Sequence, residues 1–159
     1  MAQVSYIPTG YHSVTPSLVV RGGKRALEFY KQAFGAKELG AMYMPDGEKL
    51  MHAEIQIGDS RIMLGEESPE MGTVSPQTLN GSPVSLNLYV DNCDALYQRA
   101  VGAGAKPTAP PADMFWGDRY GKVTDPFGHT WGILTHKEDV SPAEMDKRAR
   151  EWMSSMAKQ

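Results

Sequence analysis

Gly35-Ala36-Lys37 ends one apolar, helix-like stretch of this chain, and Gly104-Ala105-Lys106 ends another in the same way. With one residue of slack in a turn, the strand-like stretch from Thr15 to Val20 matches a second one from Ser85 to Val90. A duplication this regular predicts two copies of one supersecondary unit, and a site between the copies.

Each copy has the order strand, helix, strand, strand, strand. In the first copy, apolar residues recur at helical spacing until Gly35, and Gly58-Asp59 forms the turn before the last strand. In the second copy, Asn92 or the residue before it caps the helix, and Asp125-Pro126-Phe127-Gly128 forms the corresponding turn. The prolines from Pro107 to Pro111 are expected to interrupt the strand after the second helix.

These elements predict an α+β fold of two tandem βαβββ units. We expect the paired units to occupy residues 1–139 and a C-terminal helical extension to occupy 140–159. Within the paired domain, the first unit spans about 11–66, a linker about 67–82, and the second unit about 83–139.

The C-terminal helix is predicted from a capping box, in which Ser141 and Glu144 flank Pro142. Its apolar side is expected to pack on its own domain or on a dimer partner, and consists of Met145, Ala149, Trp152, Met153 and Met156.

Composition limits the possible partners. The chain has 16 basic and 19 acidic residues, so nucleic acid is not an expected partner. No apolar stretch approaches the roughly 20 residues that span a bilayer, so we expect a soluble protein with no membrane partner. The single cysteine, Cys93, excludes an intrachain disulfide and favours a cytoplasmic location. No dinucleotide-binding, phosphate-loop or nucleophile-elbow motif is present.

Three motifs carry a family resemblance: Met51-His52-Ala53-Glu54-Ile55, Phe115-Trp116-Gly117-Asp118-Arg119-Tyr120-Gly121 and Asp125-Pro126-Phe127-Gly128-His129-Thr130-Trp131. Together with Phe29-Tyr30 they resemble the vicinal oxygen chelate superfamily, which includes glyoxalase I, bleomycin-resistance proteins and extradiol dioxygenases, and more narrowly its PhnB-like branch. The resemblance covers roughly Tyr11 to His136. It implies that each unit curls its mixed sheet into half of a cup that encloses a ligand. It also implies a homodimer, whose units pair within a chain or exchange between chains.

Metal-dependent members of this superfamily place His, Gln or Glu side chains at four positions of the cup. Aligned on the motifs, those positions hold Thr15, Met63, Ser85 and Gly132. None is a good ligand for a divalent ion. We therefore expect no metal and no other cofactor.

Strand alternation predicts which side chains line the cup. Met51, Ala53, Ile55 and Ile57 should face the covering helix, so that His52, Glu54 and Gln56 face the cup. The same parity adds Thr15, Ser17, Arg61, Met63, Ser85, Asn87 and Tyr89.

Two groups of residues suggest chemistry. His52 and Glu54 share a face and are weak candidates for a catalytic pair, although an ordinary polar pair is the first interpretation. In the loop of the second motif, Phe115 to Gly121, Trp116 could stack on a planar ligand and Arg119 could bind its carboxylate or phosphate. Equally, Arg119 could pair internally with Asp118 or another acid.

Four further residues are expected to be structural. Trp131 belongs to the core, and His12, His129 and His136 serve as surface or capping groups. Cys93 lies at a helix N-terminus, which should lower its pKa, but no histidine partner for a nucleophile is evident.

The leading hypothesis is a metal-independent protein of the glyoxalase and bleomycin-resistance type that binds a small polar or aromatic molecule. Its expected contacts are Ser17, His52, Glu54, Asn87, Trp116 and Arg119. The alternative is a lyase, isomerase or dioxygenase that uses a divalent metal ion held by non-standard ligands such as His52 and Glu54. A third possibility is a dimeric interaction module that uses the C-terminal helix. The identity of the ligand stays open.

Overall fold

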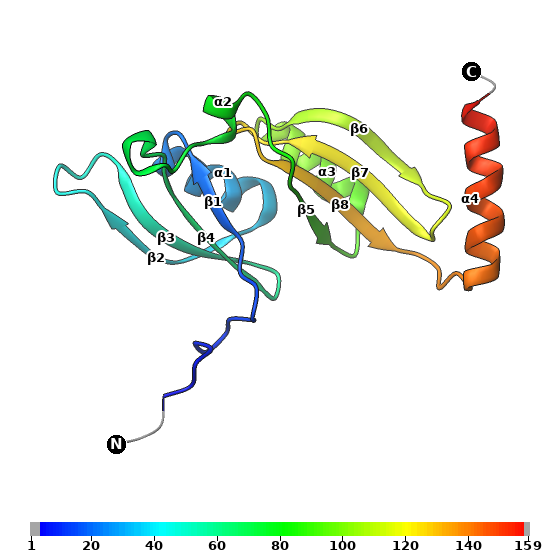
Figure 1. Cartoon of the computed structure of the whole chain (residues 1–159), viewed down its shortest axis with the longest axis horizontal. Coiled ribbons are helices and arrows are strands. Elements are labelled where there is room, and N and C mark those ends of the chain that lie inside the picture. Colours follow the sequence, from blue (N-terminus) through cyan, green and yellow to red (C-terminus); the bar gives the residue numbers. More distant parts are fainter. Residues whose placement is uncertain (1–3, 158–159) are drawn as a thin grey trace. The chain divides into compact units, whose positions relative to one another are not determined.

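The computed structural model describes residues 4–157, and they form two compact units (Figure 1). Unit 1 holds the described residues up to Ser82 together with Pro126–Gly128. Unit 2 holds Pro83–Asp125 and the chain from His129 onward. Each unit contains one βαβββ succession, and a helix follows the second, so the predicted α+β fold is confirmed.

Unit 1 contains β1 (Ser17–Val20), α1 (Gly23–Phe34), β2 (Lys37–Tyr43), β3 (Leu50–Ile57) and β4 (Ser60–Glu66). Its sheet has the order β1-β4-β3-β2, in which β1 and β4 are parallel and the other neighbours antiparallel. The helix covers one face of this sheet, because the apolar side chains of α1 and of the strands are buried against each other. The opposite face of the sheet carries the polar side chains.

Unit 2 repeats this topology with β5 (Ser85–Tyr89), α3 (Cys93–Gly102), β6 (Lys106–Asp113), β7 (Asp118–Thr124) and β8 (Thr130–His136). The order β5-β8-β7-β6 matches that of unit 1, again with one parallel pair. Asn92 caps α3 as expected, since its side chain accepts a hydrogen bond from the backbone of Ala95 at 2.9 Å. Trp131 is buried on the helix-facing side, which confirms its predicted core position.

The prolines from Pro107 to Pro111 do not interrupt β6, so that expectation was wrong. β6 is the edge strand of its sheet. On an edge strand a proline is tolerated where the backbone N–H would point away from the neighbouring strand, because no hydrogen bond of the sheet is lost there. The register shifts twice along its pairing with β7, between Pro107 and Ala109 and between Ala109 and Ala112. These irregularities absorb the prolines.

A second correction concerns Met51, which was expected to face α1. The register between β2 and β3 shifts where Met42 pairs with His52 and Tyr43 with Leu50. The extra residue is Met51, which is 48% exposed, while Leu50 is buried at 1%. The bulge reverses the side-chain parity at the start of β3, which simple alternation did not anticipate. From His52 to Ile57 the expected alternation is observed.

The segment after β4 is more ordered than a plain linker. It contains the short helices η1 (Pro69–Met71) and α2 (Pro76–Leu79).

The turn between β7 and β8 belongs to unit 1, where Phe127 is buried at 1% with its ring 6.0 Å from that of Phe29. The side chain of Gln77 donates to the carbonyl of Pro126 at 3.1 Å. Part of the core of unit 1 is therefore supplied by a distant piece of sequence.

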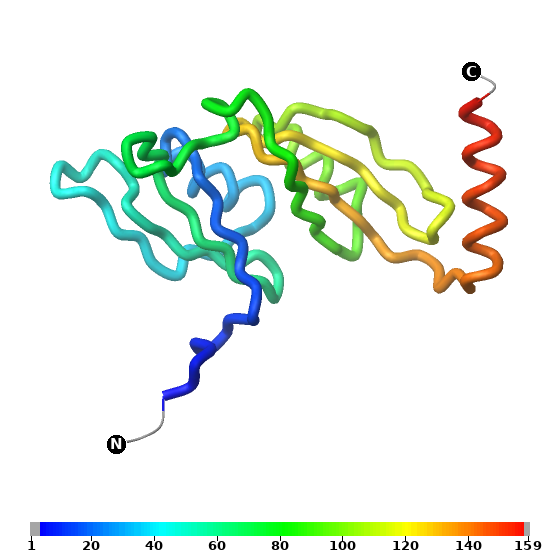
Figure 2. Tube along the Cα trace, in the orientation of Figure 1, coloured from blue at the N-terminus to red at the C-terminus, as the bar shows by residue number. Residues whose placement is uncertain are grey.

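The C-terminal helix α4 (Pro142–Met156) forms as predicted, with Ser141 accepting a hydrogen bond from the backbone of Glu144. Figure 2 shows it as a separate rod after β8. None of its described residues is buried, although Trp152 contacts Phe115 with ring centroids 5.6 Å apart. Much of its apolar side, including Met153 and Met156, is exposed.

Candidate functional site

The polar face of the sheet in unit 1, opposite α1, is the first candidate surface; we call it the unit 1 open face. Its central row is formed by Ser17, Met63 and Glu54, which are paired across β1, β4 and β3. His52 and Arg61 lie in neighbouring rows. Three predicted contacts, Ser17, His52 and Glu54, therefore share one face.

His52 and Glu54 form only a loose pair. His52 Nε2 lies 3.6 Å from Glu54 Oε1, and the two side chains are 43% and 34% exposed. This distance is beyond a normal hydrogen bond, so the pair is not locked in one geometry. The exposed fractions show that both side chains are accessible to solvent.

Tyr11, which precedes β1, also packs on this face. The Arg61 guanidinium lies over its ring, 4.7 Å from the centroid. The Tyr11 hydroxyl lies close enough to Glu54 to lower the pKa of that carboxyl, with smaller contributions from His52 and Arg61. Nevertheless, no group in the described chain meets this buried hydroxyl in good hydrogen-bond geometry. It is a polar atom that a bound molecule or a water could satisfy.

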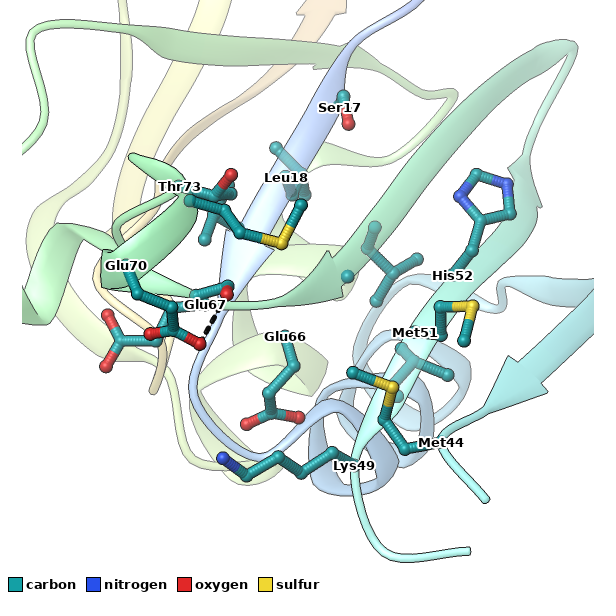
Figure 3. A pocket seen from close by; sticks show the side chains of 16 residues that line it. Ser17, Leu18, Met44, Lys49, Met51, His52, Glu66, Glu67, Glu70 and Thr73 are labelled. Atoms are coloured by element: carbon teal, nitrogen blue, oxygen red, sulfur yellow. Dashed lines mark hydrogen bonds between the residues drawn. The ribbon is translucent and has the colours of Figure 1, made fainter. Parts of the chain in front are cut away.

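A cavity of about 330 Å³ opens at one end of unit 1 (Figure 3). Ser17 and His52 line it, so it is continuous with the unit 1 open face. Flexible methionines form much of its apolar wall, which suits ligands of irregular shape. The walls come from β1, the β2–β3 hairpin, the end of β4 and the segment after it, and include Met44, Lys49, Met51, Glu66, Glu67, Glu70, Met71 and Thr73.

The carboxylates of this cavity are largely engaged by the protein itself. Glu66 accepts the backbone N–H groups of Gly22 and Gly23, at the start of α1. Thr78, Arg21 and Ser75 all donate to Glu67, and together they lower its pKa to about 2. Glu66 and Glu67 therefore fix the cavity wall to α1 and α2.

The corresponding face of unit 2, opposite α3, is the second candidate surface; we call it the unit 2 open face. Its central row is Asn87, Gly132, Lys122 and Ala109, paired across all four strands. A Cβ atom on residue 132 would lie 2.3 Å from Asn87 Oδ1 and 2.9 Å from the Tyr120 ring. The carboxamide of Asn87 therefore fills the space above Gly132. The rows on either side contain Ser85, Thr130 and Thr124, and Tyr89, Leu134 and Tyr120.

A buried carboxylate organises the end of the unit 2 open face. Asp118 is 5% exposed and accepts hydrogen bonds from the Tyr89 hydroxyl at 2.9 Å and from Trp116 Nε1 at 3.1 Å. His136 Nδ1 lies 2.7 Å from its other oxygen, and His136 Nε2 lies 3.0 Å from Asp139. Asp118, and to a lesser extent Asp139, raise the pKa of His136. Two aromatic side chains are thus held in place around one carboxylate.

Arg119 does not share this surface. It lies on the helix-facing side of β7, where its guanidinium donates to Asp94 at 2.7 Å and to Asp113 at 3.1 Å. The internal pairing considered from the sequence is therefore observed, with Asp94 and Asp113 as the acids in place of Asp118. These acids accept three hydrogen bonds from Arg119 and hold it on the other side of the sheet, so it is a weaker candidate for ligand contact than the residues of the open faces.

The four positions that hold a metal in related proteins offer poor ligands. Two of the positions aligned from the sequence, Thr15 and Ser85, do not lie beside the other two: Thr15 precedes β1 and Ser85 pairs with Thr130. The register instead places Ser17 beside Met63 and Asn87 beside Gly132. Neither pair supplies an imidazole or a carboxylate. Within residues 4–157, no three His, Cys, Asp or Glu side chains converge as a metal site would require. These residues do not fit a divalent ion.

Two predictions about single residues need correction. Cys93 is buried at 1%, and its thiol donates to the carbonyl of Ile133. Burial raises the pKa of Cys93, helped by Asp94, so it outweighs the lowering expected from the helix N-terminus. His129 is buried at 8% and is not a surface residue.

The sequence analysis did not place Lys122, Asp118 or Tyr11 among the residues of the open faces. The first two could have been found by extending the strand alternation from Gly132 to its neighbour β7, since residues 118, 120, 122 and 124 share one parity. No local signal marks Tyr11, because its position depends on how the chain before β1 crosses the sheet.

Comparison with known proteins gives a family match over most of the chain. Residues 11–133 match the model of the Glyoxalase/Bleomycin resistance protein/Dioxygenase superfamily. An uncharacterized protein of Mycobacterium tuberculosis is 44% identical over 136 residues, covering 84% of this chain and 79% of the relative. A crystal structure of a gene product of Arabidopsis thaliana is 30% identical, with a TM-score of 0.62, covering 77% of this chain and 98% of the other. The PhnB protein of Bacillus cereus, at 15% identity and a TM-score of 0.61, covers 78% of this chain and 99% of the other; it shares the fold.

Proposed function

Because the chain belongs to the Glyoxalase/Bleomycin resistance protein/Dioxygenase superfamily, we propose that it binds a small polar or aromatic molecule on its open sheet faces without a metal ion. One observation carries this proposal. At the centre of each open face, the aligned metal positions Met63 and Gly132 are paired with Ser17 and Asn87, and none of these four residues is a histidine or an acid. The chemistry of these side chains favours hydrogen bonding and contact over coordination.

Candidate contacts lie on each of the two faces. Ser17, His52 and Glu54 are available on unit 1, and Asn87 and Trp116 on unit 2. The cavity of about 330 Å³ at the end of unit 1 has the size of a small-molecule site. That both units together enclose the ligand stays a prediction from the sequence.

Elemental analysis of freshly purified protein, together with native mass spectrometry, tests this proposal. We expect no stoichiometric Zn, Ni, Mn or Fe, and a bound organic molecule that is released on denaturation. About one metal ion per chain, lost in the His52→Ala variant, would contradict the proposal and favour the metal-dependent lyase, isomerase or dioxygenase. If no bound molecule is found, a thermal-shift screen with antibiotics and aromatic acids would narrow the ligand class.

Three finer statements belong to the same proposal. The quoted motifs favour the PhnB-like branch of the superfamily. A homodimer is expected, and the mass in solution checks it. Truncation after Asp139 checks whether α4 contributes to the dimer.

No helix within the described residues is long and apolar enough to span a bilayer. A cytoplasmic location stays a prediction.

A further inference from the structure

Lys122 lies at the centre of the unit 2 open face and has no partner of its own within the described chain. It is half-buried, and neither a carboxylate nor a carbonyl of the described residues accepts a hydrogen bond from it. An ammonium group without an acceptor in the protein gains from an acceptor that reaches it from outside. We infer that Lys122 anchors the carboxylate of a planar aromatic acid. This inference rests on the proposed function, because it specifies the ligand of the same faces.

The neighbours of Lys122 leave room for such a ligand. In its row, Ala109 on the β6 side carries only a methyl group, whereas the Asn87 carboxamide covers Gly132 on the other side. The room beside the lysine stem therefore lies toward Ala109, at the edge strand of the sheet.

The charges on this face favour an anion. The register adds Lys106 at the edge of the same face, in the row of Thr124 and Thr130. Asp118 is the one acid that the described strands place on the unit 2 open face. Its oxygens accept hydrogen bonds from Tyr89 and Trp116 and contact His136, and it forms no ion pair with Lys122.

An aromatic wall borders the lysine. The Tyr120 ring leans over Gly132, and the Trp116 ring lies 6.0 Å from it in an edge-on arrangement. Tyr89 is 59% exposed, and its hydroxyl is fixed by Asp118. Rings held in this way offer contact area at little entropic cost to a flat ligand.

The unit 1 open face lacks this combination. There Glu54 and the acids of the cavity lie near the cation Arg61 or Lys49, and an added carboxylate would meet negative charge. An anion therefore prefers unit 2.

Isothermal titration with 2-naphthoate and the neutral 2-naphthamide tests the inference. Lys122→Met should weaken naphthoate binding at least tenfold. Lys37→Met, which makes the same change of charge on β2 of unit 1, should leave binding within twofold of the original protein. Naphthamide should bind the original protein no more tightly than naphthoate binds Lys122→Met.

Amide chemical shifts of the original protein provide a test that does not depend on a variant folding. Naphthoate should move signals of residues 120–124 and 130–134. Equal naphthoate affinity in the original protein and Lys122→Met, shifts confined to unit 1, or no binding at all would overturn the inference. If a copurified molecule binds Lys122→Met with undiminished affinity, the proposed function stands and only the role of Lys122 falls.

Discussion

The two units share one topology and differ in what they present to a ligand. Both sheets place the first and last strands side by side in parallel and bury one face under a helix. On the open faces, unit 1 presents an arginine, a methionine and a loose histidine–glutamate pair, whereas unit 2 presents hydroxyls, an amide, a lysine, aromatic rings and a buried aspartate bonded to a histidine. The covered faces are constrained by packing and the open ones are not. Duplication therefore preserved the frame while the two surfaces acquired different chemistry.

The largest expected effect tests how separate the two units are. Phe127 lies between β7 and β8 in sequence but packs against Phe29 and Tyr30 in unit 1. Phe127→Ala should therefore destabilise unit 1 by about 3–5 kcal/mol, the usual cost of removing a buried aromatic ring. Hydrogen exchange should show lost protection in α1.

Phe115→Ala is the matched control, because Phe115 is a half-buried ring of unit 2 that contacts Trp116 and Trp152. It should leave α1 protected. Lost protection confined to β8 in Phe127→Ala would contradict the assignment of this turn to unit 1.

The internal comparison also shows what sequence can and cannot predict. Local signals in the sequence predict the repeat, the end of α1 at Gly35, the start of α3 at Asn92 and the core position of Trp131. Each of these features depends on residues close in sequence. The bulge at Met51 and the continuous edge strand β6 do not, because both depend on the pairing partner.

The candidate site was predicted less completely than the fold. Strand parity places His52 and Glu54 correctly on one face. For Arg119 the sequence left ligand contact and internal pairing open, because its partners, Asp94 and Asp113, come from α3 and β6 and no sequence spacing reveals such a contact.

Two turn glycines allow a smaller test of the same comparison. Gly117 in unit 2 has φ 98°, and a Cβ there would lie 2.3 Å from the carbonyl oxygen of Glu138. Gly47 in unit 1 has φ 72° and open space around it. Gly117→Ala should cost about 2–4 kcal/mol from strain plus steric clash, and Gly47→Ala about 1 kcal/mol from strain alone. Urea unfolding measures both, and equal costs would show that the approach of Glu138 to Gly117 is unimportant.

The units should respond to pH in opposite directions. The pKa of Glu67 in unit 1 is lowered from 4.5 to about 2, so its contribution is present above pH 4.5 and is lost as the pH falls toward 2. The pKa of His136 in unit 2 is raised from 6.5, so its contribution is present below pH 6.5 and is lost as the pH rises through the folded-state value. Unfolding free energies measured across pH should therefore flatten on the acid side in Glu67→Gln and on the basic side in His136→Gln. If the free energy of unfolding of His136→Gln still fell with rising pH as in the original protein, the contacts of His136 with Asp118 and Asp139 would not stabilise unit 2.

The smallest expected effect on stability concerns the pair that first suggested chemistry. His52 and Glu54 are 3.6 Å apart and substantially exposed, so their attraction is screened by solvent. His52→Ala should change the free energy of unfolding by less than about 0.5 kcal/mol. A loss well above that value would mean that the pair supports the sheet, and its place in a ligand site would then need independent evidence. If stability is unchanged while the affinity of a copurified ligand falls, the histidine acts through contact with the ligand. The unit 1 open face would then take part in binding alongside unit 2.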